Sequence, residues 1–151
     1  MSDGIYHLAY VSDAQLVDPS DPEQQELLEW QLKRILDAAH SNNSAAGVTG
    51  ALLFSGQHFA QVLEGPQAAI NERYRRISQD TRHNNVTPLL YEPAGERQFA
   101  DWSMALCGAE EVDNLPDNFQ VKPSPGSLEA GNLGRSIVAS LAAAIGKRQT
   151  A

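Results

Sequence analysis

Two β-type runs stand side by side in the middle of the chain, and this arrangement limits the possible folds more than any other feature. Residues 48–55 (VTGALLFS) and 58–64 (HFAQVLE) are rich in β-branched and aromatic residues. Between them, Gly56-Gln57 fits a two-residue hairpin loop with glycine first. The sequence therefore predicts a central antiparallel hairpin, although Gly50 weakens its first strand.

A helix is predicted on each side of this hairpin. The first runs from about residue 20 to His40, with Ser20 and Glu23 at capping-box spacing, and residues 41–44 (SNNS) end it. The second begins after Gly65-Pro66. Both show apolar residues at the helical period, which indicates one buried face on each: Leu28, Leu32, Ile35, Leu36 and Ala39, then Ile70, Tyr74 and Ile77.

Three more strands are predicted, over residues 5–11, 86–91 and 102–106. In the first, Tyr6, Leu8 and Tyr10 share one face. The resulting order is βαββαββ. The expected fold is therefore an α+β, ferredoxin-like βαββαββ sandwich, with both helices on one face of the sheet and a C-terminal helical cap.

The composition changes after Gly108. Residues 110–131 hold three prolines and read as a linker, and residues 132–147 as a final amphipathic helix. The apolar side of that helix consists of Ile137, Val138, Leu141 and Ile145. The helix must bury this side on the open face of the sheet or on another chain. We expect a domain over residues 1–108 and a linker with a packing helix over 109–151.

Charge and composition exclude several classes of protein. The net charge of −8 opposes binding to nucleic acids and to anionic membranes, and the arginines of residues 73–82 fit a solvated helix face. A single cysteine, Cys107, rules out an internal disulfide. Neither a signal peptide nor a membrane span is visible. No metal site is predicted, because the four histidines lack metal-ligand spacing, and no common catalytic motif is present.

The most unusual feature is a polar residue inside an apolar strand. Gln61 lies between Phe59 and Leu63, on the face that the helices should cover. Tyr10 projects from the first strand onto the same expected face. Both groups need partners when buried. If the two strands are neighbours, the pair can serve as a structural hydrogen bond that fixes register, or it can face a bound polar ligand.

Asn42 and Asn43 form a second polar point. They can act as a helix stop, or their amides can recognise a heterocycle. Ile35 and Ile77 fit the hydrophobic core by their spacing, and they could also hold a flat ring between the helices.

Five segments together resemble one family, the BLUF sensors, which use flavin to detect blue light. They occur in the order and spacing of the family across about 100 residues: LAYVSDA (8–14), NNSAAGVTGALLF (42–54), FAQVLEG (59–65), RYRRISQDTRH (73–83) and ERQFADWSM (96–104).

This resemblance implies specific site residues. FAD would be held non-covalently, with its ring between Ile35 and Ile77 and its polar edge on Asn43, beside Asn42. Arg82 would lie on the polar side, His83 would also contact the cofactor, and Tyr10 and Gln61 would form the photoactive pair. Trp102 and Met104 match last-strand residues that relay the signal, and either can lie near the glutamine.

The resemblance also implies a mechanism and a setting. Light-driven electron and proton transfer between Tyr10 and the flavin would rearrange the hydrogen bonds of Gln61. The signal would pass through the last strand and the C-terminal helix to a partner protein. We expect a non-enzymatic photoreceptor in the bacterial cytoplasm that forms a homo-oligomer. It would not bind nucleic acid or a membrane directly.

Two other functions fit the fold expected from the sequence. One is a small acylphosphatase-like enzyme, which would need an anion-binding loop with an arginine near the first strand; residues 11–15 (VSDAQ) contain none. The other is an interaction module without a cofactor. The colour of the purified protein distinguishes these from a flavin sensor.

Overall fold

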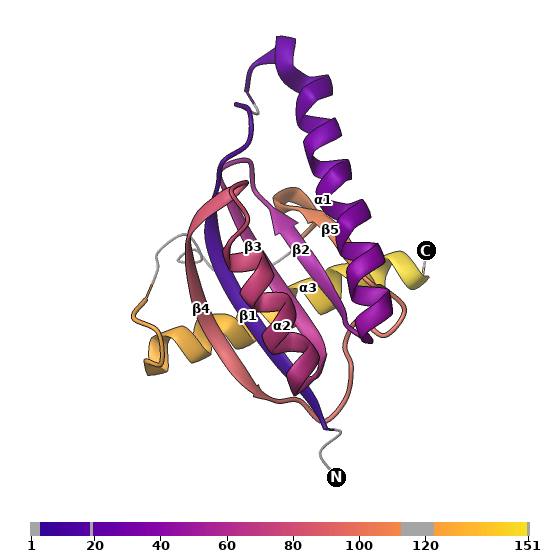
Figure 1. Ribbon diagram of the computed structural model, residues 1–151, viewed down its shortest axis with the longest axis vertical. Coiled ribbons are helices and arrows are strands. Elements are labelled where there is room, and N and C mark those ends of the chain that lie inside the picture. The colour runs from indigo at the N-terminus through magenta and orange to yellow at the C-terminus, as the bar shows by residue number, and fades with distance from the viewer. Residues whose placement is uncertain (1–3, 19, 113–122, 151) are drawn as a thin grey trace.

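The computed structural model describes residues 4–18, 20–112 and 123–150, and it contains one five-stranded sheet with helices on both faces (Figure 1). The strands lie in the order β4-β1-β3-β2-β5. Their bounds are β1 Ile5–Ala14, β2 Thr49–Phe54, β3 His58–Pro66, β4 His83–Pro93 and β5 Ala105–Gly108. The main helices are α1 Gln25–Ala46, α2 Gln67–Ser78 and α3 Leu128–Thr150.

The topology confirms the ferredoxin-like prediction. β1 pairs antiparallel with both β3 and β4, and β3 pairs antiparallel with β2. Each helix of the repeated strand–helix–strand unit therefore connects strands separated by one other strand. The edge strand β5 runs parallel to β2. In the β1–β3 register Tyr10 lies directly opposite Gln61, so the strands that carry these two side chains are neighbours.

The sheet separates two apolar layers. In Figure 1, α1 and α2 lie on the near face and α3 crosses behind the sheet. Alternate residues of each strand enter opposite layers, as strand geometry requires. Leu8, Tyr10, Phe59 and Leu63 pack toward α1 and α2. Ala9, Val11, Ala60 and Val62 pack in the cluster that contains α3, which settles the predicted strand faces.

The first helix is longer than its sequence predicts. The prediction that residues 41–44 end it is wrong, because α1 continues through Asn42 and Asn43 to Ala46. Gly47 ends it instead, because its φ of 73° is the left-handed conformation that glycine adopts at low cost. Its backbone N–H donates to the carbonyl groups of Asn43 and Ser44. At the other end, Asp21 rather than Ser20 caps the 3₁₀ turn Pro22–Gln24 that leads into the helix.

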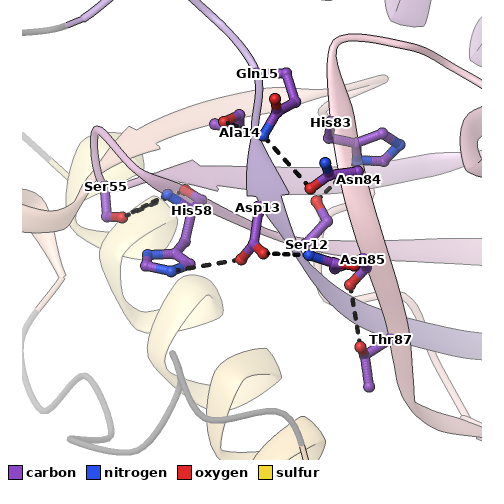
Figure 2. A network of polar contacts seen from close by, with 10 residues as sticks. All are labelled: Ser12, Asp13, Ala14, Gln15, Ser55, His58, His83, Asn84, Asn85 and Thr87. Carbon is purple, nitrogen blue, oxygen red and sulfur yellow. Dashed lines mark hydrogen bonds and ion pairs between the residues drawn. The ribbon is translucent and has the colours of Figure 1, made fainter.

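The outer strands also differ from prediction. β4 begins at His83 rather than at residue 86, and its irregular start lies beside the end of β1 (Figure 2). There Asn85, at a φ of 53°, donates from Nδ2 to Asp13 across 2.7 Å, which supports its unusual backbone conformation. β5 begins at Ala105, so Trp102 and Met104 precede the last strand rather than belonging to it.

Gly50 does not break β2, because the strand needs a residue without a side chain there. A Cβ at this position would lie 2.1 Å from the carbonyl oxygen of Val62 on β3. The glycine therefore permits a close approach of two backbones.

The C-terminal helix covers the face of the sheet opposite α1 and α2. Ile137, Leu141 and Ile145 are fully buried there, so the apolar side of α3 packs on the sheet of its own chain. α3 begins at Leu128, which corrects the expectation that residues 128–131 belong to the linker. Residues 113–122 of that linker lie outside the described part. Across residues 4–18, 20–112 and 123–150, no helix is both long and apolar enough to cross a bilayer.

Candidate functional site

A cavity of about 200 Å³ opens between α1 and α2, above the face of β1 and β3. Its lining contains all eight residues that the sequence nominates for cofactor contact: Tyr10, Ile35, Asn42, Asn43, Gln61, Ile77, Arg82 and His83. The fold thus brings together side chains from β1, α1, β3, α2 and β4. A concave site with apolar walls and a few converging polar groups is typical of small-molecule binding.

Tyr10 and Gln61 form the polar floor of this cavity. The Tyr10 hydroxyl donates a short hydrogen bond to Oε1 of Gln61. Both side chains are almost fully buried, with 2% and 5% of their surface exposed. Burial raises the pKa of the Tyr10 phenol well above its ordinary value, and nearby Tyr74 and Asp80 raise it further. The phenol is therefore fully protonated at neutral pH.

The other end of the Gln61 amide contacts the segment before β5. Gln61 Nε2 lies 3.4 Å from Sδ of Met104 and donates to it. Met104 is buried in the layer of α1 and α2, whereas Trp102 packs against the cluster on the α3 side. Of the two nominated relay residues, the structure therefore places Met104 next to Gln61 and Trp102 away from it.

Asn43 lies on the wall formed by α1. Its side chain, 1% exposed, donates from Nδ2 to the Ser103 carbonyl at 2.9 Å. Its Oδ1 accepts from Nε of Arg73 at 3.1 Å. An amide has two hydrogens on nitrogen and two lone pairs on oxygen, so one donor and one acceptor position remain for a ligand.

The upper wall is formed by α2 and the start of β4. Arg82 binds Asp80 through Nε at 2.9 Å, and this contact holds the pKa of the Asp80 carboxyl below its usual range. The ring of His83 packs edge-on to Tyr10, with centroids 5.9 Å apart. Its Nε2 contacts the carbonyl of Ile77 and its Nδ1 the hydroxyl of Ser12, so both ring nitrogens have protein partners. His83 therefore offers a ligand the edge of its ring rather than a hydrogen bond.

Ile35 and Ile77 face the cavity and are only half-buried, although they lie on the apolar stripes of their helices. Incomplete burial of two branched side chains on opposite walls leaves room for a flat apolar body. The free amide hydrogens of Gln61 and Asn43 would meet acceptors at the edge of such a body. The donor set therefore fits an isoalloxazine ring, which has apolar faces and a polar edge.

The family comparison agrees with this geometry. Residues 5–105 match the family model described as "BLUF: Sensors of blue-light using FAD". The chain belongs to the BLUF family. The resemblance seen in the sequence is thereby confirmed, and flavin binding is a property of the family to which the site belongs.

Curated relatives match only part of their own length. The chain is 41% identical over 76 residues to the blue light- and temperature-regulated antirepressor BluF of Escherichia coli, a match that covers 50% of this chain and 19% of that protein. It is 35% identical over 86 residues to the photoactivated adenylate cyclase subunit beta of Euglena gracilis, covering 56% of this chain and 10% of the relative. The shared part is thus a small portion of each larger protein.

One solved structure matches nearly the whole BLUF chain. The dark-state structure titled "BlrB - a BLUF protein" superposes with a TM-score of 0.70 at 35% identity, covering 93% of this chain and 99% of the other. That coverage includes the region of α3, so the similarity extends beyond the residues that the family model matches.

Sequence reasoning missed several cavity residues, above all Arg73, Arg76 and Asp80. The interpretation of the arginines as a solvated helix face holds for Arg75, which is exposed and bound to Glu72. It is wrong for Arg73, which lines the cavity. The helical period could have revealed this, because Arg73 follows Ile70 by three positions and precedes Ile77 by four.

Proposed function

We propose that this chain is a blue-light photoreceptor that binds FAD non-covalently between α1 and α2. The observation that carries the proposal is the Tyr10–Gln61 hydrogen bond at the floor of the cavity, with the second Gln61 contact on Met104. This arrangement joins a redox-active phenol and an amide that can exchange its donor and acceptor ends. It makes the chain a sensor and not an enzyme, because the cycle returns to its starting state without a product.

The flavin, when bound, supplies blue-light absorption and an oxidising excited state. Tyr10 would then serve as the electron donor to that group, and its phenolic proton would move along the hydrogen bond to Gln61. Because burial raises the pKa of Tyr10, the phenol holds its proton before illumination. After recombination, the amide of Gln61 is left with its donor and acceptor ends exchanged. The polar contact that Gln61 offers the flavin would then change, and the absorption of the bound cofactor would shift to the red.

The same exchange acts on Met104. With Nε2 turned away, the sulfur of Met104 faces an oxygen and loses its hydrogen bond. Met104 and Trp102 are separated by one residue and pack on opposite faces of the sheet. A movement of the segment that carries Met104 and Trp102 would therefore change the packing of Trp102 against the apolar cluster that contains α3. In this proposal Trp102, Met104 and α3 relay the light signal.

The output passes to another protein. Relatives whose sensor region resembles this chain are named as an antirepressor and as an adenylate cyclase subunit. A partner contact at α3 or at the segment before β5 would use the elements that the relay moves. Residues 1–108 would form the sensor, 109–151 would form the output segment, and a homo-oligomer in the bacterial cytoplasm remains the predicted form.

The test is the spectrum of the purified protein before and after blue illumination. The proposal predicts a yellow protein whose extracted cofactor is FAD by mass, with a reversible red shift of its absorption. A protein that stays colourless after incubation with FAD would instead favour the interaction module without a cofactor.

A further inference from the structure

The charge of the cavity is opposite to the charge of the chain. The whole sequence carries a net charge of −8. The charged residues that line the cavity are three arginines and one aspartate: Arg73, Arg76, Arg82 and Asp80. A concave surface with a cationic excess concentrates anions, and the effect is larger where the rest of the molecule repels them.

The three arginines differ in their partners. Arg82 is bound to Asp80, and Arg76 donates from Nε to Glu72 at 2.9 Å. Arg73 contacts the neutral amide of Asn43 instead. Among the residues that the structure describes, no carboxylate lies within ion-pair distance of Arg73. Its guanidinium is thus partly desolvated with no carboxylate in direct contact, although the charge of Glu72 acts on it from a distance.

Partial burial disfavours the charged form of this group. Burial lowers the pKa of Arg73, the neighbouring charge of Arg76 lowers it further, and the charge of Glu72 opposes the shift without cancelling it. Removing a cation from water costs free energy unless an anion replaces the lost hydration. An anionic ligand beside Arg73 would therefore offset this cost. Asn43 cannot, because an amide oxygen carries only a partial charge.

Arg76 is the natural second donor. It lies three residues after Arg73 on α2, which places the two side chains on neighbouring positions of one helix surface. Its ion pair with Glu72 is exposed on both sides, and such pairs are readily exchanged. Glu72 would keep a partner after the exchange, because Arg75 binds both of its oxygens.

We propose that Arg73 and Arg76 bind the phosphate groups of the cofactor, so that this chain selects phosphorylated flavins over riboflavin. The inference rests on the proposed function and adds the chemistry by which the cavity chooses its ligand. Guanidinium groups bind phosphate oxygens in pairs with favourable geometry, which suits this role better than a single ammonium group would.

The test compares riboflavin, FMN and FAD as ligands of the purified chain, with affinity followed by quenching of flavin fluorescence. The variant R73Q/R76Q removes two positive charges from the cavity. The matched control R34Q/R135Q removes two that lie outside it, since Arg34 stacks on the ring of Trp30 and Arg135 binds Glu92 on the other side of the sheet. The expected result is a loss of about tenfold or more in affinity for FMN and FAD in R73Q/R76Q alone. The loss for riboflavin should be much smaller, because R73Q affects the ring only through its contact with Asn43.

The riboflavin affinity also reports on folding. Equal losses of affinity for riboflavin, FMN and FAD in R73Q/R76Q would overturn the inference, because the two arginines would then act on the ring or on the fold. Equal losses of affinity for FMN and FAD in both double variants would overturn the inference as well, because the change in the net charge of the chain would then explain the losses. R73K/R76K should recover part of the FMN affinity. If the native chain binds the three flavins equally, the proposed function stands and only the inference fails; if it binds none, both fail.

Discussion

The side-chain nitrogen of Gln61 donates to the sulfur of Met104 across 3.4 Å, and this contact holds the amide in one of its two orientations. With the opposite orientation, an oxygen would face the sulfur and the hydrogen bond would be lost. Met104 therefore stabilises the arrangement in which Tyr10 donates to Gln61.

This relationship predicts the behaviour of Met104→Leu. Leucine keeps most of the volume and removes the acceptor, so the orientation present before illumination loses a weak hydrogen bond. We expect the red shift to persist and its thermal recovery in the dark to slow roughly two- to fivefold. Leu53→Met is the comparison, because Leu53 packs on the other face of the sheet and has no role in the proposed relay. Recovery at the native rate in Met104→Leu would show that the sulfur does not influence the amide.

A second prediction concerns Glu64, a carboxylate with no exposed surface. It accepts from His7 and Thr49 and from the backbone N–H groups of Gln98 and Phe99, so it fastens the segment before Trp102 to the sheet. Glu64→Gln replaces one carboxylate oxygen with an NH2 group. This group is a donor, and it would face the donors that now bind the carboxylate. We expect a loss of about 3 kcal/mol in the free energy of unfolding, measured with urea at pH 7. Glu29→Gln, on the exposed side of α1, should change it by less than about 0.5 kcal/mol.

The same carboxylate predicts a dependence on pH. Burial opposes its ionisation, but the hydrogen bonds from His7, Gln98, Phe99 and Thr49 outweigh burial and lower the pKa of Glu64 below 4.5, its ordinary value. Its contribution is therefore complete above pH 4.5 and is lost as the pH falls through the lower folded pKa. The stability difference between the native chain and Glu64→Gln should shrink below pH 4.5. A constant difference down to pH 3, roughly, would contradict this account.

The sequence predicted the architecture well, because burial on two faces requires alternation in strands and a period of 3.6 in helices. It failed where distant contacts decide. Asn42 and Asn43 have low helix propensity, yet α1 continues through them, since Asn43 is fixed by Ser103 and Arg73 and a glycine cap follows. The role of Glu64 could not be read from the sequence, because two of its partners are backbone groups about 35 residues away.

Gly50 gives a further prediction. A methyl group at this position would overlap the Val62 carbonyl, 2.1 Å away, near the start of β2 in the β2–β3 ladder. Gly50→Ala should lower the free energy of unfolding by at least about 2 kcal/mol, as overpacking does elsewhere. Gly95→Ala is the control, because no atom lies within 4 Å of a Cβ built there. Similar stabilities for the two variants, measured by urea unfolding, would mean that the strands separate easily at Gly50.

In the proposed photocycle, the phenol of Tyr10 supplies both the electron and the proton. Tyr74 offers a matched comparison, because its ring lies 5.8 Å from that of Tyr10 and it carries the same phenol, while only Tyr10 bonds to Gln61. The most direct test is the light-minus-dark absorption difference of FAD-loaded Tyr10→Phe and Tyr74→Phe. We expect both variants to bind FAD, Tyr74→Phe to keep the red shift and Tyr10→Phe to lose it. A full red shift in Tyr10→Phe would contradict this role of Tyr10.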